Sequence, residues 1–186
     1  FIFGIGFPVK LLAEYYRGCG RGRMKAASVF LRTCWATLLQ DQLYREAFAW
    51  LRWEVLIDGT RMPLPKYNAL LCASVKDLGC GLKPTYRAFE KRGHFHAVVS
   101  AIEPLLIPAV LPRILLGIGT RNMGIHERLA THVVIRAEHP LPYFIDGEIY
   151  RDHRELSVGA GELVRLPSFP SRPIQSPGPL LDLAAC

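Results

Sequence analysis

The chain has 186 residues, of which 50% are hydrophobic, and it carries a formal net charge of +7. This length and apolar content predict one folded domain with a hydrophobic core. The sequence contains no run of about 18 apolar residues, so no transmembrane helix is predicted. The aromatic and glycine pattern of an RNA-binding sheet is also missing.

The chain begins with Phe1 inside an apolar run and not with Met. The run, residues 1–7, predicts a buried strand, and its position at the very start indicates that the chain is part of a longer protein. No charged leader or small-residue cleavage site identifies a signal peptide. Gly4 and Gly6 alone do not make a phosphate loop, so we interpret them as close strand packing.

Two helical patterns follow the first strand. Residues 8–16 form a short one, and residues 24–39 form the clearest one, because apolar side chains recur there at helical spacing. A glycine-rich basic loop, residues 17–23, joins them. Basic side chains are concentrated in this part of the chain: Lys10, Arg17, Arg21, Arg23, Lys25 and Arg32.

This concentration of positive charge favours a polyanionic partner. We expect an anionic membrane surface and no nucleic acid. A solvated basic face that serves solubility alone is the alternative.

The cysteines are odd in number and form no C-x-x-C pair, so they indicate neither a zinc site nor a disulfide framework. They are Cys19, Cys34, Cys72, Cys80 and Cys186. A reducing, cytoplasmic location fits this pattern, with Cys34 and Cys72 as small core residues.

The middle of the chain predicts strands over 50–57, 67–73 and 94–100, the first of which ends at an Asp58-Gly59 turn. His94 and His96 alternate around Phe95. This spacing could serve a metal, but no third ligand is evident, so we expect the polar face of a half-buried strand. Residues 103–116 predict a helix that its prolines kink or shorten.

The last third again predicts strands. One covers residues 131–136, and a hairpin around Asp146-Gly147 covers 143–150, because both turn residues tolerate positive φ. Two short strands, 155–158 and 162–166, complete the domain. The proline-rich tail, 167–186, is expected to be extended or disordered.

The order of these segments resembles the C-terminal domain of the diacylglycerol kinase and sphingosine kinase superfamily, in particular bacterial soluble lipid kinases. The resemblance covers residues 1–166 and lies in the order of short motifs. These are Gly4-Ile5-Gly6-Phe7, the basic helix, Ile57-Asp58-Gly59, Tyr67-Asn68, Gly79-Cys80-Gly81, Gly93-His94-Phe95-His96, the 105–117 helix and Asp146-Gly147-Glu148.

The resemblance implies an α+β fold, with a β-sandwich-like domain of antiparallel strands and two or three flanking helices. It also implies that an N-terminal nucleotide domain, missing from this chain, binds ATP and Mg²⁺. The expected reaction is phosphoryl transfer to a lipid hydroxyl of the diacylglycerol or sphingoid-base type, by a peripheral enzyme at a membrane surface.

By the same resemblance, Glu148 accepts the proton of the lipid alcohol, and Asp146 orients it or stiffens the turn. The alternative is a simple hairpin with an exposed acid. Acyl chains are expected in an apolar cleft between the strands and the proline-broken helix.

The sequence departs from the family at one loop. Bacterial members hold a structural Mg²⁺ through an Asp, and Arg92 stands where that Asp would be. A guanidinium cannot ligate a hard cation, so this auxiliary metal site is predicted to be absent.

Two functions follow, from different classes. One is the substrate-side half of a lipid kinase, and the other is a non-catalytic module that binds lipid or a membrane surface. Hydrolase chemistry has no support, because neither a Ser-His-Asp set nor a G-x-S-x-G motif occurs.

Overall fold

A computed structural model describes residues 1–17, 22, 25, 28, 29, 32, 48–64, 66–78, 81–120 and 123–162. Strands dominate these residues, and two α-helices and one short 3₁₀ helix accompany them. The elements in chain order are β1 (Ile2–Gly6), α1 (Phe7–Tyr16), β2 (Trp53–Ile57), β3 (Thr60–Arg61), β4 (Ala69–Ala73), β5 (Phe95–Ser100), η1 (Pro104–Leu106), α4 (Ile107–Leu116), β6 (Ile125–Ala130), β7 (His132–Ile145) and β8 (Glu148–Gly159).

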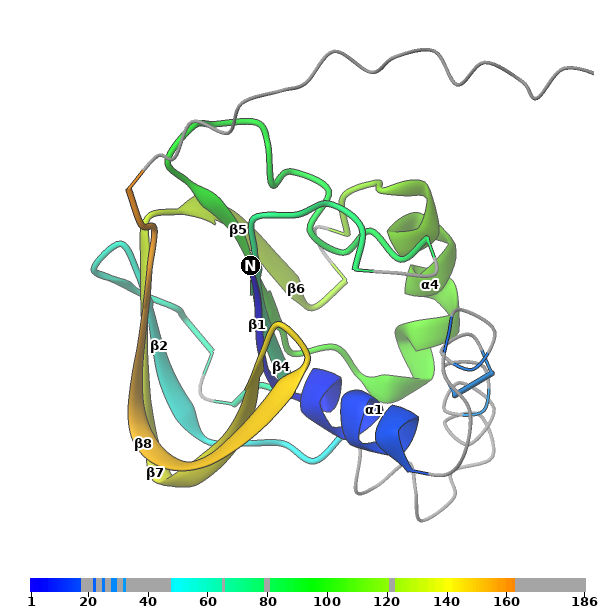
Figure 1. The fold of residues 1–186 in the computed structure, drawn as a ribbon, viewed down its shortest axis with the longest axis horizontal. Helices are drawn as coiled ribbons and strands as arrows, with labels where there is room; N and C mark the ends of the chain where they lie inside the picture. Colours follow the sequence, from blue (N-terminus) through cyan, green and yellow to red (C-terminus); the bar gives the residue numbers. More distant parts are fainter. Residues whose placement is uncertain are drawn as a thin grey trace, which may run out of the picture.

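The strands form a single eight-stranded sheet in the order β3-β2-β7-β1-β4-β5-β6, and β8 pairs with β7 in addition. The strand pairs that the structure describes are all antiparallel. The sheet curls on itself, and α1 and α4 lie together outside the curl (Figure 1). The α+β class is therefore confirmed, with one curled sheet as its sandwich-like layer.

The long strand β7 lies between β2 and β1 in the sheet. Residues 133–137 pair with β2, residues 143–145 pair with β1, and β8 accompanies both parts. The register shifts between Arg136 and Tyr143, where Pro140 and Pro142 offer no backbone donor. These prolines therefore fall where β7 passes from one partner strand to the next.

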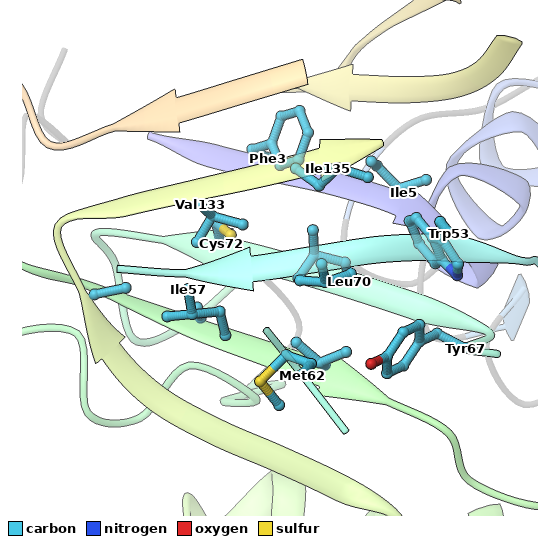
Figure 2. Packing of buried hydrophobic residues seen from close by; sticks show 14 of the residues in the cluster. Phe3, Ile5, Trp53, Ile57, Met62, Tyr67, Leu70, Cys72, Val133 and Ile135 are labelled. Carbon is cyan, nitrogen blue, oxygen red and sulfur yellow. The ribbon is translucent and has the colours of Figure 1, made fainter. Parts of the chain in front are cut away.

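Two hydrophobic clusters hold the fold together. The larger lies inside the curl and is built from both ends of the sheet, for example Phe3, Trp53, Leu70 and Val133 (Figure 2). The smaller lies between the outer face of the sheet and the helices, with members from several strands and from α1 and α4: Val9, Leu71, Val98, Ile102, Val110, Ile125 and Phe144. Burial on both faces explains why β4 and β5 are almost continuously apolar.

In the first two thirds of the chain, the predicted elements that lie within the described residues agree with the structure apart from shifts of a few residues at their ends, and β3 was not predicted. The last third needs correction. The strand over 131–136 and the hairpin over 143–150 belong to one long pair, β7 and β8, and β8 also contains 155–158. Strand β6 was not predicted.

Several predictions fall outside the described residues. They are most of the 24–39 helix, nearly all of 162–166 and the whole 167–186 tail. Four described residues of the helix, Lys25, Ser28, Val29 and Arg32, are helical. Cys72 is fully buried, as predicted for a core residue, and burial raises the pKa of its thiol. Cys34 lies outside the described residues.

Candidate functional site

The turn between β7 and β8 has left-handed backbone at both central residues. Asp146 has φ 48° and Gly147 has φ 97°, while Ile145 and Glu148 face each other as the last pair of the ladder. Positive φ at both positions is the signature of a type I′ turn, which explains why Asp-Gly is found here. Glu148 is thus the first residue of β8 and directly follows the turn.

Three hydrogen bonds attach this turn to the start of the chain. The Asp146 amide donates to the Ile2 carbonyl at 2.8 Å, and Asp146 Oδ1 accepts from the Ile2 amide at 2.7 Å. The Tyr16 hydroxyl, at the end of α1, donates to the Gly147 carbonyl at 2.7 Å. The carboxylate of Asp146 therefore binds backbone, and its position stiffens the turn.

Glu148 is exposed, and its Oε2 accepts a hydrogen bond of 2.7 Å from the hydroxyl of Tyr150. The Tyr150 ring stacks on Tyr143, with 5.4 Å between ring centroids. This hydrogen bond raises the pKa of Tyr150, because it favours the protonated phenol beside a carboxylate. Among the described residues, Glu148 forms no ion pair.

In the Asp58-Gly59 turn, too, an Asp at positive φ accepts backbone hydrogen bonds through its carboxylate, but a different residue follows the turn. Asp58 has φ 46°, and its Oδ1 accepts from the Thr131 amide, the Thr131 hydroxyl and the His132 amide at 2.7 to 3.0 Å. Burial opposes ionisation of Asp58, but these donors outweigh it and lower its pKa. Thr60 follows this turn, at the position that Glu148 has after the other turn.

The glycines of β1 pack against their neighbours, as predicted. A Cβ on Gly4 would lie 2.3 Å from the Phe144 ring, and one on Gly6 would lie 2.3 Å from the Asn68 carbonyl oxygen. Gly6 also has φ 76° and directly precedes α1. The pair lets β1 lie under Phe144 and turn sharply into α1.

The two histidines do not share a polar face, which corrects the prediction. His94 precedes β5 and contacts the Arg92 carbonyl at 3.0 Å, whereas His96 lies within β5 and is completely buried. Strand β5 is covered on both faces, so its alternation does not expose His96, while His94 outside the strand is half-buried. Neither ring nitrogen of His96 has a hydrogen-bond partner among the described residues.

A polar cluster near His96 was not predicted. Glu127 accepts hydrogen bonds from the Thr120 amide at 2.9 Å, the Thr120 hydroxyl at 2.6 Å and the Tyr86 hydroxyl at 2.7 Å. Burial opposes its ionisation, but these donors outweigh burial and lower the pKa of Glu127. Burial and the contact with Glu127 raise the pKa of Tyr86 to about 12. The two residues are far apart in sequence, so no local pattern reveals the contact.

A small cavity lies between this cluster and α4. The cavity there has a volume of about 20 Å³ and is lined by residues that include Tyr86, Ile118 and Glu127. Such a volume suits a water molecule. Helix α4 packs on the sheet through Val110, and the entry of acyl chains between the strands and this helix stays a prediction.

The described residues gather no group of three or more His, Cys, Asp or Glu side chains that could hold a metal ion. Arg92 is exposed in the turn before β5. The part of the chain that the structure describes also has no helix long and apolar enough to cross a bilayer.

The fold is similar to that of solved diacylglycerol kinase-like proteins. Two proposed diacylglycerol kinases of Bacillus anthracis str. Sterne each match over 86% of this chain. The first has a TM-score of 0.56 and 12% identity over 49% of its own chain. The second has a TM-score of 0.52 and 14% identity over 50% of its own chain. This chain therefore spans about half the length of these structures.

No protein-family model matches the sequence, and no curated protein matches it. At this level of identity, the solved structures establish the fold. The described chain has a diacylglycerol kinase-like fold, as the order of its sequence motifs predicts.

Proposed function

We propose that this chain is the substrate-side half of an ATP-dependent lipid kinase, with Glu148 as the proton acceptor. The observation that carries the proposal is the exposed carboxylate of Glu148 on a turn that is bonded to the first strand. The similarity to solved diacylglycerol kinase-like structures supports the same reaction class. ATP and its Mg²⁺ are bound, in this proposal, by a nucleotide domain outside these 186 residues.

The contacts of Glu148 suit a general base. Tyr150 donates to Oε2, and the described residues place no donor on Oε1. Oε1 is then available to accept the hydrogen of a lipid hydroxyl while the alcohol oxygen attacks the γ-phosphorus of ATP. The proton moves to Glu148, the bond between the γ-phosphorus and the bridging oxygen breaks, and ADP leaves.

The rigidity of the turn supports the same role. A general base has to stay within hydrogen-bond reach of the proton that it takes. Asp146 and Tyr16 attach the turn to β1 and α1, so the backbone of Glu148 is held by three segments of the chain. Asp146 is thus a positioning residue, and Glu148 is the catalytic residue.

The experiment is transfer of the labelled γ-phosphoryl group of ATP to a panel of lipid alcohols, by a protein that joins this chain to its nucleotide domain. We expect labelled diacylglycerol or sphingoid base, and no labelled product from water-soluble alcohols. Absence of any labelled lipid from a folded protein that binds ATP would contradict the proposal.

A non-catalytic lipid-binding module is the second candidate, and the exposed apolar surface of α4 favours it. Such a module would bind lipid equally well with Glu148 or Gln at position 148, and it would label no lipid. The transfer experiment therefore separates the two candidates.

A further inference from the structure

The segment containing η1 and α4 is apolar on all sides. Between Pro104 and Gly119 the only charged residue is Arg113. A helix that is hydrophobic all round is ordinarily buried in a protein core or in contact with lipid. The ten residues of α4 are too few to span a bilayer, so a surface contact is the form that lipid contact can take here.

One face of α4 is buried. Val110 is 1% exposed, and Ile107 and Ile114 pack beside it in the cluster that covers the outer face of the sheet. The opposite face and the adjoining turns are exposed. Their five large side chains, which we call the α4 ridge, are Leu105 at 54%, Leu106 at 45%, Leu115 at 43%, Leu116 at 70% and Ile118 at 46% exposure. Large apolar side chains exposed along one short segment in this way indicate an interaction surface.

Positive charge lies at one end of the ridge, while the exposed Glu103 precedes the other end. Arg113 is exposed on α4 itself, and the Lys83 amide donates to the Ile114 carbonyl at 3.1 Å. The Lys83 side chain also lies beside the end of α4, because a Cβ on Gly117 would be 3.5 Å from it. Two cations thus lie at the C-terminal end of α4.

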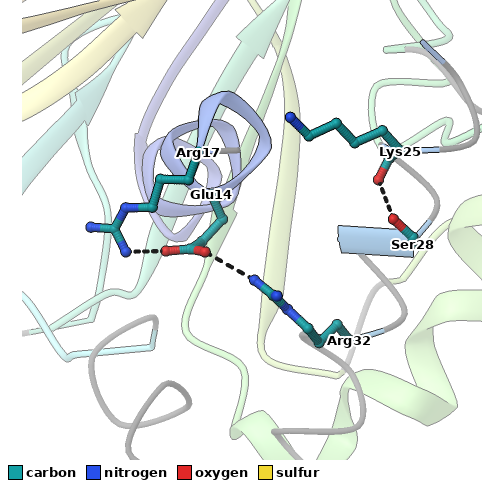
Figure 3. Close-up of polar contacts among 5 residues, drawn as sticks. All are labelled: Glu14, Arg17, Lys25, Ser28 and Arg32. Atoms are coloured by element: carbon teal, nitrogen blue, oxygen red, sulfur yellow. Dashed lines mark hydrogen bonds and ion pairs between the residues drawn. The ribbon is translucent and has the colours of Figure 1, made fainter. Parts of the chain in front are cut away.

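Described basic residues on and after α1 lie on the same layer. Helix α1 packs through Val9 and Leu12 into the same cluster as α4, and both helices lie on one side of the sheet (Figure 1). Glu14 of α1 pairs with Arg17, and with Arg32 at 3.0 Å, and the two arginine side chains are 76% and 64% exposed (Figure 3). One carboxylate is thus shared by two exposed guanidinium groups, which leaves this layer positive.

We propose that the α4 ridge and the cations around it form the surface that binds an anionic lipid bilayer. The leucines enter the boundary between headgroups and acyl chains, to a depth of about 5–10 Å, and the cations meet acidic headgroups. As a partner of a lipid kinase this surface rests on the proposed function, but the binding step itself needs neither ATP nor Glu148. Tyr16 links the same layer to the turn before Glu148, so binding places that carboxylate near the lipid surface.

The test is co-sedimentation of the 186-residue chain with vesicles of phosphatidylcholine, with and without about one third phosphatidylglycerol. The variant is Leu105→Gln with Leu116→Gln, and the matched control is Leu105→Met with Leu116→Met, which keeps the surface apolar. We expect binding to anionic vesicles that the Gln pair weakens about tenfold or more, and that the Met pair preserves. Equal binding by the Gln pair and the wild type would overturn the proposal.

The contribution of positive charge to vesicle binding is tested with a second pair of variants and a matched control pair. Lys10→Gln with Arg17→Gln is expected to weaken binding to anionic vesicles about fivefold for each charge. Arg151→Gln with Arg154→Gln removes two exposed charges from β8 and is expected to leave binding unchanged. An equal loss for both pairs would contradict a specific surface.

Two further outcomes would overturn the proposal. One is a chain that binds no vesicles and self-associates through the ridge, shown by a dimer that the Gln pair converts to a monomer in sedimentation. The other is a chain that binds neutral and anionic vesicles equally. Glu148→Gln is expected to bind vesicles like the wild type, so loss of phosphoryl transfer and loss of binding can be told apart.

Discussion

Asp146 and Ile2 exchange two hydrogen bonds across 144 positions of the chain, one through the Asp146 amide and one through its carboxylate. The contact fixes the turn before Glu148 to the first strand. Local turn chemistry sets the backbone of the turn, and the contacts with Ile2 attach it to the start of the chain.

Replacement of Asp146 by Ala is expected to lower the free energy of unfolding by about 1–3 kcal/mol. The variant loses a charged acceptor for the Ile2 amide and places Ala at positive φ. Asp146→Asn is the matched control, because an amide oxygen still accepts and Asn tolerates this backbone. Urea unfolding measures the difference, and equal loss in both variants would contradict the role given to the Oδ1 contact.

Replacement of Gly6 by Ala is expected to cost about 2 kcal/mol or more. The new Cβ would meet the Asn68 carbonyl, and the backbone there has φ 76°. Gly161→Ala is the control, because nothing lies within 4 Å of a Cβ at that position. A Gly6→Ala protein as stable as the control in thermal unfolding would show that β1 does not need this close approach.

The stability of the fold is expected to fall as the pH drops below about 6.5, through His96. Burial lowers the pKa of this imidazole in the folded protein, although the charge of Glu127 acts in the opposite direction. The unfolded state then binds the proton more readily than the folded state, so stability is complete above the unfolded pKa and is lost toward the lower, folded one. The other groups that act on His96 are Arg87, the backbone of Thr85 and Glu90, with Tyr86 at its ring.

The measurement is the free energy of unfolding at several pH values for the wild type and His96→Leu. The wild type should lose at most about 1.4 kcal/mol per pH unit more than the variant below pH 6.5. Parallel curves for the two proteins would refute the assignment to His96.

The contact between Glu148 and Tyr150 can be tested through the tyrosine. Because the carboxylate accepts the phenol proton in a hydrogen bond, Glu148→Gln should lower the pKa of Tyr150 toward its ordinary value. Ultraviolet titration of tyrosinate, with Tyr150→Phe to identify the signal, measures this shift. An unchanged titration in Glu148→Gln would show that the two side chains do not meet.

Local chemistry allowed much of the fold to be predicted. The Asp58-Gly59 and Asp146-Gly147 turns, the apolar strands and both helices follow from positive φ and hydrophobic spacing within short windows. The continuity of β7 does not, because Pro140 and Pro142 resemble a break in the sequence. In the structure these prolines lie where β7 passes from its pairing with β2 to its pairing with β1. That change of partner strand cannot be read from the local sequence.

The candidate site was predicted only in part. The position of Glu148 after a turn follows from the sequence, but the bonds from Ile2 and Tyr16 join segments more than 100 residues apart. Burial of His96 was missed because a strand covered on both faces gives no alternating pattern. Its polar neighbours Tyr86 and Glu127 come together through strand pairing, which no local window contains.

The most direct test of the account is the turnover of Glu148→Gln in a protein that joins this chain to its nucleotide domain, compared with Glu155→Gln, another exposed acid on β8. We predict that Glu148→Gln lowers kcat for lipid phosphorylation by about 10²- to 10⁴-fold with the KM for ATP unchanged, and that Glu155→Gln has little effect. A Glu148→Gln enzyme that turns over within twofold of the wild type would contradict the central claim.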